Sequence, residues 1–310
     1  MSLFPPPTDI ETEVWSELPD EFRKTGDAMQ TVWGEGNALG ARMDSFLEGP
    51  SFDRQGNLWV VDIPFGRVFR ISPDKVWTLA AEYDGEPNGL KIRNDGEIFI
   101  ADYKRGIMHL DPATGEVTEH RTRIRLEPFK GCNDLVFGSN GDMYFTDQGQ
   151  TGWHDPTGRV FRLTPEGRLD LLVDTVPSPN GLVLNLDESI LFLAVTRANQ
   201  VWRVPLPPEG PTYKVGTFLH LSGGGGGPDG MALDEAGSLL VCHAGMGSVW
   251  VFDRMGEPLY RIRSCRGINT TNIAYGGPDN TGLFITESES GSILRAELPT
   301  PGRVMYSHMD

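Results

Sequence analysis

Short apolar runs that each follow a turn recur along the whole chain. Runs such as "LWVVD" and "IFIAD" are short and rich in β-branched and aromatic residues, which is typical of buried β-strands. The first apolar positions of the six runs are Leu58, Ile98, Met143, Ile190, Leu239 and Leu283. Their spacings of 40, 45, 47, 49 and 44 residues match the ~40–50 residues of a four-stranded propeller blade. This period predicts an all-β fold, a six-bladed β-propeller with four antiparallel strands per blade.

The termini of the chain decide how such a ring is completed. One helix is expected, a short one near Thr12–Lys24, because helical periodicity is weak elsewhere in the sequence. Either the N-terminal stretch "MQTVWGE" or the C-terminal stretch "GRVMYSH" could supply the last outer strand. We therefore assign residues 1–310 to a single propeller domain, in which residues 1–30 form an extension that packs on the propeller or closes it.

Polar residues form a second regular series, ten positions before the first five apolar runs. Its members are Glu48, Asn88, Asn133, Asn180 and Asp229, and Asn272 is a sixth, eleven positions before Leu283 because "GGPDNTG" contains one inserted residue. Each is an ordinary turn residue when taken alone. Because the innermost strand of every blade starts on the same face beside the central axis, these side chains are expected to converge there.

The oxygen-bearing side chains of this series indicate a central metal site. Carboxylate and amide oxygens without His or Cys favour a hard cation, calcium first and magnesium second. A polar lining for a water-filled channel is the alternative. That alternative would bring Glu48 and Asp229 together without a compensating charge, and like charges repel.

Charge and composition exclude several partner classes. The formal net charge of −16 opposes binding to nucleic acid and to anionic membranes, which both recruit Lys and Arg. The three cysteines show no CxxC spacing, so neither a disulfide framework nor a zinc site is indicated. The N-terminus lacks the basic and apolar regions of a signal peptide, and no window reaches the roughly 18 apolar residues of a membrane span. We expect a cytoplasmic protein and leave its oligomeric state open.

A run of five glycines, residues 223–227, directly precedes Pro-Asp-Gly. The run lies between the fourth and fifth repeats, where a blade-to-blade crossing is expected, so a domain linker is not indicated. No GK[ST] sequence follows, which argues against a phosphate loop. Because glycine permits positive φ and close backbone approach, the run is interpreted as a device that presents Asp229 towards the axis.

Several motifs resemble the senescence marker protein, gluconolactonase and luciferin-regenerating enzyme family of six-bladed propellers. They are "LEGPSFD", "CNDLVF", "YFTD", "SPNGLVLN", "GPDGMALD" and "TNIAYGG", and they extend over nearly the whole chain after about residue 30. The resemblance implies that Glu48, Asn180 and Asp229 hold one divalent cation, with Asn133 as a fourth ligand or a substrate contact. Calcium is expected as the cofactor, and magnesium, manganese and zinc are the alternatives.

The resemblance also implies hydrolysis of a small sugar lactone. A cation with open positions can polarise the lactone carbonyl and stabilise the oxyanion that forms. Asp229 is the candidate base for the attacking water, with direct nucleophilic attack by its carboxylate as the alternative. Two other functions remain open: an organophosphate or aromatic-lactone hydrolase with the same metal site, and a non-catalytic calcium-binding propeller.

Residues at the ends of the second strands are candidates for substrate contact. His243 and Asp147 each lie fourteen positions after a member of the polar series, where the second strand returns to the metal face. The longest loop on that face, residues 148–158, contains Trp153 and His154. We predict that these four residues and Asn133 contact the substrate. The alternatives are that His243 is an ordinary histidine at the end of a strand and that Trp153 only packs onto its own blade.

Overall fold

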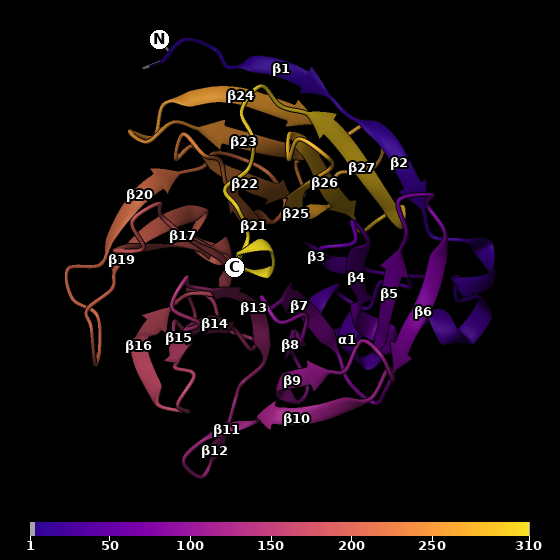
Figure 1. Ribbon diagram of the computed structural model, residues 1–310, viewed down its shortest axis with the longest axis horizontal. Helices are drawn as coiled ribbons and strands as arrows, with labels where there is room; N and C mark the ends of the chain where they lie inside the picture. Colours follow the sequence, from indigo (N-terminus) through magenta and orange to yellow (C-terminus); the bar gives the residue numbers. More distant parts are fainter. Residues whose placement is uncertain (1–3, 310) are drawn as a thin grey trace.

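Six β-sheets surround a central axis in the computed structural model, which describes residues 4–309. Figure 1 shows the sheets as blades whose innermost strands face the axis. In the first four blades, four strands that follow one another in sequence form one antiparallel sheet. The predicted all-β, six-bladed propeller is therefore confirmed.

The first three blades come from the first half of the chain. Blade one contains β3 (Leu47–Phe52), β4 (Leu58–Asp62), β5 (Arg67–Ile71) and β6 (Trp77–Glu82). Blade two contains β7 (Pro87–Ile92), β8 (Ile98–Asp102), β9 (Gly106–Leu110) and β10 (Val117–Arg121), and is followed by a hairpin of β11 (Arg123–Ile124) and β12 (Glu127–Pro128). Blade three contains β13 (Cys132–Phe137), β14 (Met143–Asp147), β15 (Gly158–Leu163) and β16 (Leu169–Val176).

The last three blades include the strands from the N-terminus. Blade four contains β17 (Pro179–Leu184), β18 (Ile190–Val195), β19 (Gln200–Pro205) and β20 (Gly216–His220). Blade five contains β21 (Gly227–Leu233), β22 (Leu239–Ala244), β23 (Ser248–Phe252), β24 (Pro258–Arg263) and β1 (Thr8–Glu11). Blade six contains β25 (Thr270–Gly276), β26 (Gly282–Glu287), β27 (Ser292–Glu297) and β2 (Glu13–Glu17).

The N-terminal strands close the ring. Strand β2 pairs antiparallel with β27 and so becomes the outer strand of blade six, and β1 adds to blade five in parallel with β24. The outer strand thus comes from neither "MQTVWGE" nor "GRVMYSH". The helix expected near Thr12–Lys24 is wrong, because this segment contains β2 and only a short 3₁₀ turn, Asp20–Phe22. The open edge of β27 offers hydrogen bonds that outweigh the weak local preference for a helix.

We expect Trp15→Ala to lower the free energy of unfolding by roughly 2 kcal/mol, because Trp15 in β2 is a half-buried aromatic anchor. Its ring packs edge-on against Phe284 with the centroids 5.1 Å apart. Thermal denaturation measures the effect, and Trp153→Ala is the matched control because that indole is 67% exposed. Equal melting temperatures for the two variants would contradict a stabilising role for β2.

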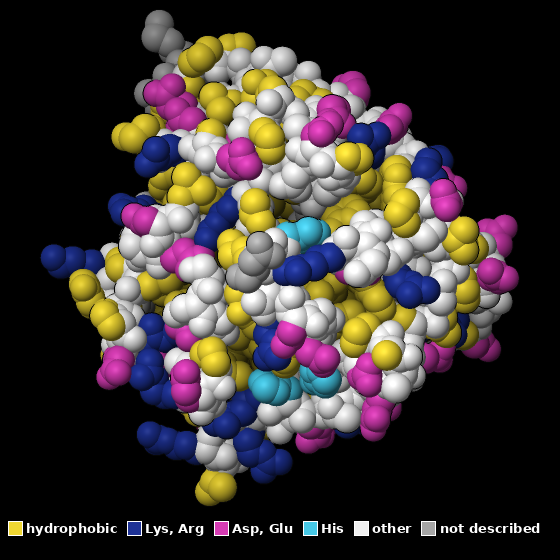
Figure 2. All heavy atoms as spheres, in the orientation of Figure 1, with side chains coloured by type: hydrophobic (Ala, Val, Ile, Leu, Met, Phe, Trp, Pro, Cys, Tyr) yellow, Lys and Arg dark blue, Asp and Glu magenta, His cyan; other side chains and the backbone are white. Residues whose placement is uncertain are grey.

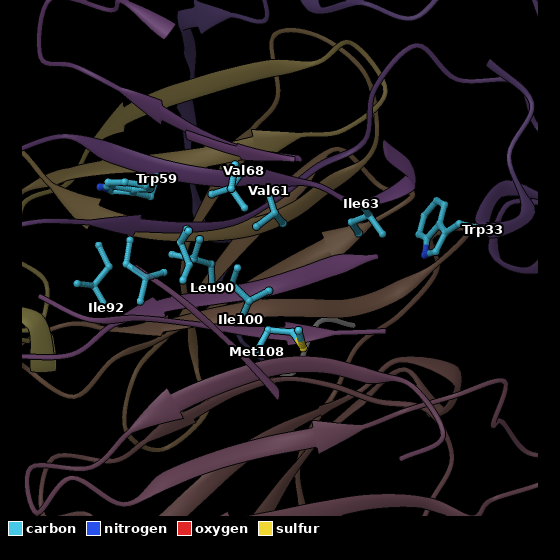
Figure 3. Packing of buried hydrophobic residues seen from close by; sticks show 12 residues of the cluster. Trp33, Trp59, Val61, Ile63, Val68, Leu90, Ile92, Ile100 and Met108 are labelled. Carbon is cyan, nitrogen blue, oxygen red and sulfur yellow. The ribbon is translucent and has the colours of Figure 1, made fainter. Parts of the chain in front are cut away.

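The hydrophobic core is divided among the interfaces between neighbouring blades. The interface between blades one and two contains Val61 from β4, Leu90 from β7 and Ile100 from β8, as Figure 3 shows. Trp33 joins the same cluster from the short helix α1 (Val32–Asn37), whose N-terminus is capped by the Thr31 hydroxyl. Since strands in the middle of a blade are buried on both faces, their sequences are continuously apolar rather than alternating.

The C-terminal segment crosses one end of the central channel. In Figure 1 the chain ends over the middle of the ring. The Arg303 amide bonds the Leu233 carbonyl at the far end of β21, and Arg54 donates to the Ser307 carbonyl across the ring. Figure 2 shows acidic and basic side chains interspersed over this face. Because the inner strands end here, the polar series at their beginnings lies at the opposite end of the channel.

Candidate metal centre and substrate cavity

Every innermost strand has an irregular register near its beginning. Pairing shifts occur at Glu48/Ser51, Pro87/Gly89, Cys132/Leu135, Pro179/Leu182, Pro228/Met231 and Thr270/Asn272. A bulge disrupts the ladder and turns side chains away from the regular alternation. The polar residues of the first five blades lie at these bulges, which explains how they can point towards the axis.

The sixth member of the series lies one position earlier than the sequence spacing predicts. Tyr275 pairs with Leu283, eight positions on, whereas Phe52 of blade one pairs with Leu58, six positions on. The turn in blade six is therefore two residues longer, not one. Thr271 is the true equivalent of Glu48, and Asn272 occupies the next position.

Asn272 nevertheless lies in the centre of the site. Its Nδ2 donates to Glu48 Oε2 over 2.8 Å and lies 3.4 Å from Asp134 Oδ2. Glu48 Oε2 also accepts from the Gly49 amide at 2.6 Å. Residues from blades one, three and six are thus joined in one buried network.

Asp134 is a central carboxylate that the sequence analysis missed. It follows Asn133 and occupies the position at which four other blades have glycine: Gly49, Gly89, Gly181 and Gly230. A Cβ atom at Gly89 would clash with Asp134, so the glycine makes space for this side chain. The break in the glycine pattern was the signal in the sequence that could have identified it.

Three carboxylates, Glu48, Asp134 and Asp229, share the axis, and burial raises the pKa of each. Burial and then the charge of Asp134 raise the pKa of Glu48 to about 7. Burial and then the charges of Glu48 and Asp134 raise the pKa of Asp229 well above its usual range. The Asn180 side chain hydrogen-bonds Asp229 and opposes this rise. The structure therefore brings Glu48, Asn180 and Asp229 together, with Asp229 the most exposed of the three carboxylates.

The side chain of Asn133 is buried beside this group. Its Nδ2 donates to Gln148 Oε1 over 3.0 Å, and Gln148 Nε2 donates in turn to Ser178 Oγ over 3.0 Å. These bonds fix the Asn133 amide nitrogen towards the loop that follows β14. Asn133 thus connects the axial group to the loop containing Trp153 and His154.

His243 and Asp147 are engaged within the protein. The fully buried His243 ring accepts from Trp250 Nε1 over 3.2 Å through Nδ1, and its Nε2 lies 3.1 Å from the Gly223 carbonyl. Burial lowers the pKa of His243, consistent with a neutral ring that donates from Nε2. The Asp147 carboxylate accepts hydrogen bonds from the Arg159 guanidinium and from the backbone amides of Lys130 and Gly131. These contacts make both residues supports for loops and leave no free ring nitrogen on His243 for a substrate.

The glycine run packs directly over His243. Gly223 and Gly224 have φ of +79° and +78°, a region that favours glycine. A Cβ at Gly224 would lie only 2.6 Å from His243 Nε2. Close approach to the histidine, together with positive φ, therefore requires glycine at these positions.

Trp153 and His154 line a cavity of about 530 Å³ on the face where the innermost strands begin. The cavity lies among the loops after β14 and β18 and the end of α1. Its lining also includes Gln148, Ser178 and Asn37. Gln150 holds α1 to the loops, donating to Asn37 Oδ1 over 3.0 Å and contacting the Tyr103 hydroxyl at 2.7 Å. A cavity of this size holds a small molecule.

Amides would have to contribute to any metal site here. Within residues 4–309, no three or more His, Cys, Asp or Glu side chains are arranged as a metal-binding cluster. The predicted ligand set needs only two carboxylates and takes its other oxygens from Asn180 and Asn133.

In the same described range, the helices are too short or too polar to span a bilayer.

Comparisons with known proteins identify relatives over most of the chain. The family described as the SMP-30/Gluconolactonase/LRE-like region matches residues 46–289. Lactonase drp35 of Staphylococcus aureus (strain MW2) is 31% identical over 233 residues, which cover 70% of this chain and 69% of the relative.

Two solved structures share the fold at low sequence identity. A calcium-binding regucalcin from Agrobacterium tumefaciens superposes with a TM-score of 0.77 at 22% identity, covering 98% of this chain and 99% of the other. A gluconolactonase from Xanthomonas campestris superposes with a TM-score of 0.73 at 21% identity, covering 93% and 98%.

Proposed function

The chain belongs to the SMP-30/gluconolactonase/LRE-like family, and from this premise we propose that it is a divalent-metal-dependent lactonase that opens a small sugar lactone. The observation that carries the proposal is the convergence of Glu48, Asn180 and Asp229 on the axis, next to a cavity of about 530 Å³. The relatives named lactonase and gluconolactonase support the reaction class.

The residues present fit a hard cation. Glu48, Asn180 and Asp229 would hold it, with Asn133 as a fourth ligand or close neighbour, and all four offer oxygens of the kind that calcium prefers. The mutual repulsion of Glu48, Asp134 and Asp229 is relieved when a positive charge lies among them. The regucalcin neighbour, described as calcium-binding, supports calcium as the first choice over magnesium, manganese and zinc. When bound, the cation would supply Lewis-acid polarisation of the lactone carbonyl.

Asp229 is proposed as the general base. Its carboxylate removes a proton from the attacking water as the water oxygen bonds to the carbonyl carbon. The ring C–O bond then breaks, and the ring oxygen takes up the proton from Asp229 to give the hydroxy acid and regenerate the carboxylate. Direct attack by the Asp229 carboxylate is the alternative. Asn133 orients substrate from beside the cavity, where it is hydrogen-bonded to the lining residue Gln148. Trp153 and His154 form the wall of the cavity, and His243 and Asp147 hold the surrounding loops.

We expect the purified protein to bind one equivalent of calcium and to release acid from an aldonolactone above the spontaneous rate. Metal analysis and calorimetry measure the first result, and proton release from gluconolactone measures the second. Aromatic lactones and an organophosphate ester belong in the same panel, because they test the second candidate function. Calcium binding without turnover of any ester would instead indicate a non-catalytic propeller.

A further inference from the structure

The cavity on the metal face has a single permanent charge in its lining. Of the described residues that line it, Arg197 alone is a cation and none is Asp or Glu. The remaining polar lining consists mainly of amides and hydroxyls, among them Asn37, Gln148 and Ser178. Such a lining can form hydrogen bonds with sugar hydroxyls, and Arg197 supplies one positive charge that can bind an anionic group.

Within residues 4–309, Arg197 is not neutralised by any carboxylate in an ion pair. Arginines near the same face in other blades are paired: Arg67 with Asp62, Arg105 with Asp84 and Arg159 with Asp147. The Arg197 side chain is exposed and its stem passes Gly152, where an added Cβ would lie 3.6 Å from Arg197 Cγ. Its guanidinium is therefore available to a ligand.

The backbone of Arg197 is fixed relative to Asp229. Arg197 lies in the 3₁₀ turn Thr196–Ala198, and the Thr196 hydroxyl donates to the Pro228 carbonyl over 2.8 Å. Pro228 immediately precedes Asp229 in β21. A cation is thus held beside the strand that carries the proposed base.

From this geometry we propose that the preferred substrate is a lactone bearing a carboxylate, such as the monolactone of a sugar diacid, with the carboxylate bound by Arg197. The proposal rests on the proposed lactonase function. A planar guanidinium binds a carboxylate through two parallel hydrogen bonds, which fixes orientation as well as position. The strongly negative protein repels anions, so the positive charge of Arg197 favours their binding in this cavity.

The test compares two lactones of equal ring size, the γ-lactones of gluconic acid and of glucaric acid, which differ in a hydroxymethyl and a carboxylate group. The parent enzyme should show the higher kcat/KM for the glucaric lactone. Arg197→Gln should lower that value roughly 10- to 100-fold, the range for a lost charged hydrogen bond, and change the gluconic lactone less than threefold. Arg197→Lys should retain part of the preference, and higher ionic strength should reduce it.

Arg105→Gln is the matched control, because Arg105 is already paired with Asp84 and should leave both values unchanged. Equal effects of Arg197→Gln on the two lactones, or none on either, would overturn the inference and leave the lactonase function intact. Failure of the parent enzyme to open either of these lactones or gluconolactone would refute the sugar-lactonase function itself. Calorimetry with glucarate, compared between the parent and Arg197→Gln, gives a readout that needs no turnover, and equal affinity of the two proteins for glucarate would also overturn the role of Arg197.

Discussion

Asp229→Asn should lower lactone turnover by about 10²–10⁴-fold at saturating calcium, the usual cost of losing a general base. The amide keeps an oxygen for the cation and nearly the same volume, but it cannot take up a proton from water. Affinity for calcium should weaken as well, because one negative charge leaves the axis. The measurement follows proton release from gluconolactone at several calcium concentrations.

Two comparisons separate catalysis from coordination at this position. Asp174→Asn makes the same change at an exposed site in β16 and should retain the parental rate. Glu48→Gln should recover much of its activity when calcium is in excess, since Glu48 is assigned to coordination alone. Near-parental turnover of Asp229→Asn at saturating calcium would show that Asp229 is only a ligand.

The metal-free protein should become less stable as pH rises from about 4.5 to 7, because of Glu48. The pKa of Glu48 is raised from 4.5 to about 7 in the folded chain, so its ionisation costs more there than in the unfolded chain. The contribution of Glu48 to the free energy of unfolding is therefore fully present below its pKa in the unfolded chain, and it is lost as pH rises through its pKa in the folded chain. By linkage the loss is of the order of 3 kcal/mol.

Urea denaturation after chelation, repeated across this pH range, measures the effect. Glu48→Gln should remove most of the decline relative to the parent, and calcium should suppress it in the parent by supplying the opposing charge. Glu116→Gln is the control, since Glu116 is exposed and lies just before β10, the outermost strand of blade two. Parallel pH profiles for the metal-free parent and Glu48→Gln would contradict the role assigned to Glu48.

The blades could be predicted from sequence because each one repeats its own local pattern. Turn, apolar run and second strand recur within every 40–49 residues, so the fold is encoded six times over. The polar series was found for the same reason, since a fixed offset from each run marks the same place at the axis.

Other features depend on contacts between distant segments, which local patterns do not encode. The segment "EVWSE" becomes a strand only because β27 offers it an edge. The position of Asn272 in its strand depends on the pairing between β25 and β26. The sequence predicts one inserted residue in the turn between these strands, whereas the structure has two. The central position of Asp134 could not be predicted, because it depends on the space left by Gly89 of the neighbouring blade. The hydrogen bonds of the His243 ring likewise come from Trp250 and from Gly223 in the glycine run.

The pairing of β2 with β27 also constrains how the protein can be made. Strand β2 is synthesised long before its partner β27, which is complete only after residue 297 has been added. During this interval β2 stays unpaired, while blades one to five can form as their own strands emerge. Blade six is thus the last to be completed, by a contact between segments nearly 280 positions apart, and long-range pairing of this kind is slow. A nascent chain arrested before β27 should remain open to proteases at its N-terminus, and the same cut in the finished protein should be protected.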